Sequence, residues 1–89
     1  MECEWDPAKA RANLTKHGIR FADAAAALED DSALTIEEVD LGEHRWVTLG
    51  ADARAGVLVF VYTWRDDRVR LISARRATRS ERRQYEEYR

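Results

Sequence analysis

Arginine is concentrated at the C-terminal end of this 89-residue chain. Residues 68–89 contain eight Arg against three Glu, whereas residues 1–67 contain seven basic and fourteen acidic residues. The formal net charge of −2 therefore hides a strong charge polarity along the chain. Because the planar guanidinium group matches a pair of phosphate oxygens, this cluster predicts a local anionic ligand rather than a generally basic protein.

Three of these arginines have no obvious structural purpose. Arg75 and Arg76 follow an apolar strand and have no partner at helical spacing, so we expect them to emerge where that strand leaves the core. Strict alternation along the strand predicts two faces, one with Val69, Leu71, Ser73 and Arg75 and the other with Arg70, Ile72, Ala74 and Arg76. Arg79 lies in the first turn of the final helix, where the helix dipole disfavours a cation. All three are predicted to bind an anion, and neither Arg75 nor Arg76 is expected to contribute much to stability.

Arg82 and Arg83 have a simpler interpretation. Each is followed four residues later by a glutamate, Glu86 or Glu87, which places opposite charges together on a helix. Pairs of this kind are common on solvated helix faces and contribute little to stability. We favour the solvated-face interpretation for both residues and keep anion binding as the alternative.

Lys16 and His17 form a second basic group, at the end of the first predicted helix. A cation there stabilises the helix without any further role. Histidine is also the side chain that titrates near neutral pH, so proton transfer is the functional alternative. Arg45 begins a strand beside an acidic loop, and Trp64 ends a strand where a nucleobase could stack on it. Surface and core roles are the simpler alternatives for these two.

The composition limits the class of protein. The single Cys3 excludes an intramolecular disulfide, and one Cys with two scattered His does not form a zinc cluster. No apolar run is long enough to span a bilayer, because the longest, AGVLVFVY, has the length of a strand. The N-terminus MECEWDPAK lacks the pattern of a signal peptide. We expect one domain over residues 1–89, cytoplasmic, with no metal or cofactor and no membrane partner.

Three helices are predicted by their end signals. In DPAKARANLTKHG, Asp6 caps the first turn, Pro7 suits the first helical position, and Gly18 suits the left-handed C-terminal position. RFADAAAALEDD is an Ala-rich helix with an apolar face. The last helix begins with a capping box, formed by Thr78 and Glu81.

The remaining segments alternate with the period of a strand. They are ECEW, ALTIEEV, HRWVTLGAD, GVLVFVYTW and RVRLISARR. GVLVFVYTW is apolar on both faces, so we expect it to be a central strand. Short connections on either side of it predict an antiparallel meander. The predicted order is β-α-α-β-β-β-β-α, an α+β domain with helices against an antiparallel sheet.

The segments WDPAKARANLTKHGIRF, HRWVTLG and ISARRATRSERRQYEE, in this order, resemble the BrnT family of bacterial type II toxins. The similarity runs from Trp5 to Glu87, and SARRAT followed by ERRQYEE is its most specific part. One departure is visible: the second helix of the family often opens with a Ser or Asp cap, and Arg20 stands in that place here. This change weakens the start of the helix.

The resemblance implies a RelE-like fold and an endoribonuclease toxin that halts translation. It implies a BrnA-like antitoxin with a ribbon-helix-helix domain. It also implies that toxin and antitoxin form a higher-order hetero-oligomer, which binds operator DNA through the antitoxin. By position, it places the catalytic site on Lys16, His17, Arg45, Arg75 and Arg76. The additional RNA contacts that we predict are Arg70, Arg79, Arg82, Arg83 and Trp64.

The chemistry predicted for this site is metal-independent transesterification, in which the 2′-hydroxyl of the RNA is the nucleophile. Acidic residues gather in the first two-thirds of the chain, whereas the candidate site consists of Arg, Lys and His. A cationic site repels a divalent metal but stabilises the negative charge of a phosphorane. The alternative is a toxin or interaction module of the same fold that binds and blocks a protein target, because fold alone does not decide function.

Overall fold

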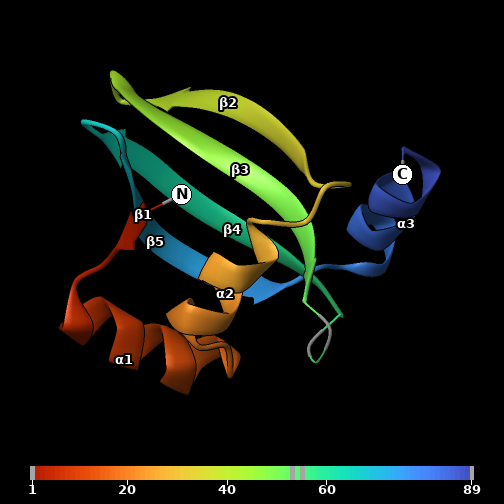
Figure 1. The fold of residues 1–89 in the computed structure, drawn as a ribbon, viewed down its shortest axis with the longest axis horizontal. Helices are drawn as coiled ribbons and strands as arrows, with labels where there is room; N and C mark the ends of the chain where they lie inside the picture. The colour runs from red at the N-terminus through yellow and green to blue at the C-terminus, as the bar shows by residue number, and fades with distance from the viewer. Residues whose placement is uncertain (1, 53, 55, 89) are drawn as a thin grey trace.

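The computed structural model of the chain describes residues 2–52, 54 and 56–88. The elements follow the predicted order, and the α+β class is confirmed (Figure 1). They are β1 (Glu2–Glu4), α1 (Pro7–His17), α2 (Phe21–Ala27), β2 (Leu34–Asp40), β3 (Glu43–Asp52), β4 (Gly56–Arg65), β5 (Arg68–Arg76) and α3 (Arg79–Glu87).

The strands form one sheet in the order β1-β5-β4-β3-β2. Strands β3 to β5 form the predicted antiparallel meander, and β2 extends it. β1 pairs with the edge of β5 in parallel, so the sheet is mixed and the prediction of a purely antiparallel sheet was wrong. β4 occupies the centre of the sheet, which confirms the interpretation of its apolar residues on both faces. The turn between β4 and β5 is tight, and Asp66 takes a positive φ of 59° there.

The two faces of the sheet are covered unequally. Figure 1 shows α1 and α2 together along one side, with α3 apart from them at the far end. Phe60 of β4 belongs to the larger core, which includes Phe21 of α2. Val59, its neighbour, belongs to a smaller core with Leu49 of β3 and Tyr85 of α3. Because alternate residues of a strand point to opposite faces, α3 covers the second face and covers it only at one end.

The ends of the helices follow the predicted local rules. The Asp6 side chain accepts a hydrogen bond from the backbone N–H of Ala8, and Gly18 ends α1 in the left-handed conformation with φ 71°. α3 begins with the complete capping box of Thr78 and Glu81. Short polar side chains at these positions satisfy backbone groups that the helix leaves unpaired. α2 begins after Arg20 without a side-chain cap, as its sequence suggested.

A bulge in β5 makes the predicted alternation of its faces wrong. Val61 of β4 pairs with Ser73, but the next residue, Tyr62, pairs with Leu71, so Ile72 is an extra residue in β5. One extra residue reverses the alternation for the rest of the strand. Ala74 is therefore fully buried in the larger core with Leu71.

Asn13 joins α1 to the open edge of β5. Its side-chain amide donates to the carbonyl of Ala74 at 2.8 Å, and its amide oxygen accepts from the N–H of Ala74 at 3.0 Å. The same amide nitrogen donates to the carbonyl of Ile19 at 3.0 Å. The side chain of the buried Asn13 thus makes the two hydrogen bonds to Ala74 that a neighbouring strand would otherwise make, and it holds α1 beside β5.

Candidate nucleic-acid interface

A cavity of about 440 Å³ lies where β3, β4 and β5 pass the first turns of α1. It is lined by Lys9 of α1, Glu43, His44, Arg45 and Trp46 of β3, Thr63, Trp64 and Arg65 of β4, and Arg70, Leu71 and Ile72 of β5. This lining contains four Lys or Arg residues and one carboxylate residue. The excess of positive charge in this lining concentrates anions such as nucleic-acid phosphates.

Three predicted residues, Arg45, Trp64 and Arg70, line this cavity. Arg70 pairs with Thr63 across the sheet, and Arg45 precedes Trp46, which pairs with Tyr62 on the next strand. Each arginine has a carboxylate nearby, since Arg45 lies 3.5 Å from Glu43 and Arg70 lies 3.9 Å from Glu4. These ion pairs are long and partly solvated, so they hold the guanidinium groups only weakly.

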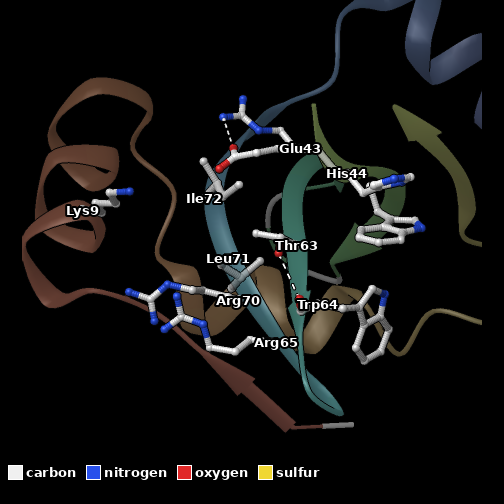
Figure 2. A pocket seen from close by; sticks show the side chains of 11 residues that line it. Lys9, Glu43, His44, Thr63, Trp64, Arg65, Arg70, Leu71 and Ile72 are labelled. Atoms are coloured by element: carbon white, nitrogen blue, oxygen red, sulfur yellow. Dashed lines mark hydrogen bonds and ion pairs between the residues drawn. The ribbon is translucent and has the colours of Figure 1, made fainter. Parts of the chain in front are cut away.

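Trp64 points away from the basic side chains. Figure 2 shows Arg65 and Arg70 directed toward the side on which Lys9 lies, whereas Trp64 and His44 are directed away from it. Trp64 packs edge-on against Tyr62 with ring centroids 6.5 Å apart, and it is 41% exposed. A base stacked on Trp64 would therefore lie on the other side of the strands from Arg70.

A second cavity continues from the first along α1. Lys9 and Ile72 line both, and the second is completed by Ala12, Asn13, Lys16, His17 and Ser73. The structure therefore brings Lys16 and the half-buried His17 beside β5, next to the cavity that holds Arg45 and Arg70. The attachment of α1 through Asn13 sets this arrangement.

Lys9 and Arg65 are lining residues that the sequence interpretation missed. Lys9 precedes Lys16 by seven residues, two helical turns, so the two lie on one face of α1. That spacing was a signal in the sequence. Arg65 lies two residues after Thr63 and therefore shares its face of β4.

Arg75 has a helical partner, contrary to the prediction. Its two terminal nitrogens donate to the two carboxylate oxygens of Glu81, at 2.8 and 3.0 Å. The bulge at Ile72 places Arg75 on the face that α3 covers, where it pairs across the sheet with Val59 of the smaller core. The hydrogen bonds to Glu81 raise the pKa of Arg75. The interpretation of Arg75 as a side chain without a structural role was therefore wrong.

The other terminal arginines point in several directions. Arg76 is exposed and pairs across the sheet with Leu58 of the larger core, so it leaves β5 on the face opposite to Arg75. Arg79 and Arg83 line a separate cavity along α3, together with Ser80, Gln84 and Glu87. Arg82 is exposed. The terminal cluster is thus divided between both faces of the sheet and the outer side of α3.

Within residues 2–52, 54 and 56–88, no three His, Cys, Asp or Glu side chains are grouped to hold a metal ion. No helix among those residues is long and apolar enough to cross a membrane. Cys3 is half-buried, and this burial raises the pKa of its thiol.

Comparisons with known proteins cover most of the chain. The crystal structure of the Brucella abortus ribonuclease toxin BrnT, at 1.1 Å, is similar in fold with a TM-score of 0.68. The two are 24% identical, and the match covers 89% of this chain and 99% of that one. No curated protein sequence matches the chain. A family model described as "Ribonuclease toxin, BrnT, of type II toxin-antitoxin system" matches residues 5–81. The chain therefore belongs to the BrnT family of ribonuclease toxins of type II toxin–antitoxin systems.

Proposed function

We propose that this protein is a metal-independent endoribonuclease that cuts RNA in the cytoplasm and so inhibits translation. The observation that carries the proposal is the pair of adjoining cavities that share Lys9 and Ile72. They gather basic side chains from α1, β3, β4 and β5 around one stretch of the sheet. A cationic surface of this kind attracts the RNA backbone and stabilises negative charge on phosphorus.

The proposed roles follow from position. Lys9, Arg45 and Arg70 line the first cavity and bind phosphates there. Lys16 and His17 line the second cavity, where one of them transfers the proton.

Arg75 is proposed to contact the scissile phosphate from the end of β5, and Arg76, which leaves β5 on the opposite face, is proposed to contact a neighbouring phosphate. Arg75 does so by exchanging the carboxylate of Glu81 for phosphate oxygens, which suit the same bidentate geometry. Arg79, Arg82, Arg83 and Trp64 remain proposed contacts for the flanking RNA.

The reaction proposed is transesterification. The 2′-oxygen of the target nucleotide loses its proton to the general base and attacks the adjacent phosphorus, and the 5′-oxygen of the next nucleotide leaves with a proton. The products carry a 2′,3′-cyclic phosphate and a 5′-hydroxyl. Basic side chains suit this route because charge builds on the phosphorane oxygens without a need for a metal-bound water.

The test is end-group analysis of fragments from naked RNA. We expect cleavage to persist in EDTA, to stop when the target nucleotide is 2′-deoxy, and to weaken steeply with added salt. Arg70→Ala should reduce the salt dependence of RNA binding, whereas Arg20→Ala, at an exposed arginine outside both cavities, should not. Fragments with 5′-phosphate ends that form only with magnesium would refute the mechanism. RNA binding without cleavage would instead favour a toxin that acts by blocking a target.

A type II toxin has an antitoxin partner, and we propose that here it is a BrnA-like protein with a ribbon-helix-helix domain. The complex is proposed to be a hetero-oligomer that binds operator DNA through the antitoxin and covers the basic edge of the toxin. Co-expression of the toxin gene with the gene beside it, followed by co-purification, tests this partner. A high yield of uncomplexed toxin from growing cells would argue against it.

A further inference from the structure

A groove of about 390 Å³ lies on the face of the sheet that α3 covers only in part. It is lined by Leu34 and Ile36 of β2, Val47 and Leu49 of β3, and Glu81, Gln84, Glu87 and Tyr88 at α3. Its described lining residues do not overlap with those of the cavity that holds Lys9 and Arg70. The groove therefore adjoins the candidate RNA site without sharing its cavity, since Glu81 in the groove binds Arg75 and Val47 shares a face of β3 with Arg45.

Two apolar side chains of this groove are strongly exposed. Ile36 is 59% exposed and Tyr88 is 71% exposed, and they line the same groove from β2 and from the end of α3. β2 is the outer strand of the sheet, so its far edge carries no neighbouring strand among the described residues. Exposed apolar side chains gathered in one groove indicate a protein-binding surface.

One carboxylate of the groove constrains the partner. The charged side chains among its described lining residues are Glu81, which is ion-paired with Arg75, and Glu87. Glu38, two residues after Ile36 on β2, lies on the same face, but Arg45 of β3 is its cross-strand neighbour. A partner that fills this groove is therefore expected to bring apolar anchors and a Lys or Arg beside Glu87, since like charges would be repelled.

We infer that this groove is where the antitoxin docks, through an amphipathic helix with apolar residues on one face and a basic residue beside Glu87. A groove between a helix and a strand accepts a helix laid along it, with anchors at a spacing of three and four residues. The inference rests on the proposed function in one respect, that the toxin has a separate antitoxin chain. It makes binding of the antitoxin depend on apolar side chains, such as Ile36, that are not among the proposed RNA contacts.

The groove can be tested with one matched pair of substitutions on β2. Ile36 and Val39 are β-branched residues with similar exposure, 59% and 63%. Ile36 pairs with Val47 in the groove, whereas Val39 pairs with His44 and lies on the other face. Ile36→Asp should therefore weaken binding of the antitoxin encoded beside the toxin gene by roughly tenfold or more, and Val39→Asp should not. Both variants should still cut naked RNA like the wild type.

A second pair tests the charge of the partner. Glu87→Lys places a cation in the groove, whereas Glu86→Lys, on the same exposed helix, places one outside the described lining. We expect only Glu87→Lys to weaken the complex, and we expect added salt to reduce that difference. Tyr88→Ser changes the same groove from the end of α3 instead of from β2. It should also weaken the complex, so the test does not depend on whether Ile36→Asp folds.

Several results would overturn the inference. Equal binding by Ile36→Asp and Val39→Asp would exclude the groove, whether both bind tightly or both fail. A toxin that dimerises by itself, and loses only that dimer on Ile36→Asp, would make a second copy the occupant. A wild-type toxin that cuts RNA but binds no adjacent gene product would refute the antitoxin and the docking site together. Absence of RNA cleavage by the wild type would refute the proposed nuclease activity instead.

Discussion

The carboxylate of Glu81 holds the guanidinium group of Arg75 with two hydrogen bonds, Nη1 to Oε1 at 2.8 Å and Nη2 to Oε2 at 3.0 Å. The same Oε1 also accepts from the backbone N–H of Thr78 at 2.8 Å. One side chain therefore closes the capping box of α3 and joins that helix to the end of β5. Because Arg75 donates to its ionised form, the pKa of Glu81 falls from 4.5 to about 2.

This carboxylate should make stability depend on pH in the acid range. A group whose pKa is lowered by folding contributes its full stability above its unfolded value of 4.5 and loses it as the pH falls toward 2. Allowing for the solvent around the pair, we expect a contribution of roughly 1–2 kcal/mol. Urea unfolding at pH 7, 4 and 3 measures it, and Glu81→Gln should flatten the slope between pH 4.5 and 2. An unchanged slope in Glu81→Gln, with Glu86→Gln as the control, would show that the bridge does not form in solution.

Substitution of Arg75 should lower both stability and RNA cleavage, whereas substitution of Arg76 should lower cleavage alone. Arg75→Ala leaves Glu81 without its bidentate partner, so we expect a loss of about 1–2 kcal/mol of stability together with the loss of RNA cleavage. Arg76 is exposed on the other face, so Arg76→Ala should reduce cleavage with little change in Tm. Thermal unfolding and cleavage of naked RNA, measured on the same preparations, distinguish the two. Full activity of either variant would remove that arginine from the proposed site.

Asn13 should contribute far more to the free energy of unfolding than its neighbour on α1, Leu14. Asn13→Ala removes three hydrogen bonds and leaves both backbone groups of Ala74 without this partner, at a cost of about 2–4 kcal/mol. Leu14→Ala, at an exposed position on the same helix, should cost much less. Urea titration compares the two variants. A mild effect of Asn13→Ala would mean that α1 is held to β5 by other contacts.

The proton-transfer role can be assigned to Lys16 or His17 by kinetics. Loss of the general base lowers kcat by roughly 10²–10⁴-fold and removes one limb of the pH–rate profile. A residue that only completes the helix end changes stability by about 0.3–1 kcal/mol and leaves the profile intact. We expect one of His17→Ala and Lys16→Ala to show the first pattern and the other the second. Wild-type profiles in both variants would exclude the second cavity as the source of the base.

The order of elements could be predicted because it depends on rules that act within a few residues. Asp6 and Gly18 mark the ends of α1 through hydrogen bonds and a backbone conformation that involve only the neighbouring chain. Thr78 and Glu81 do the same for α3. The apolar residues on both faces of β4 required cover on both sides, which placed it at the centre of the sheet.

The site depended on contacts between distant parts of the chain, which is why its details were missed. The extra residue in β5 exists only through pairing with β4, and it carried Arg75 to the face of α3. Asn13 and Ala74 are 61 residues apart, yet their hydrogen bonds bring Lys9, Lys16 and His17 beside β5. The sequence by itself thus determined the elements and the residue types available for chemistry. The tertiary structure decided which side chains share a face, because one inserted residue reverses a strand and one buried amide positions a helix.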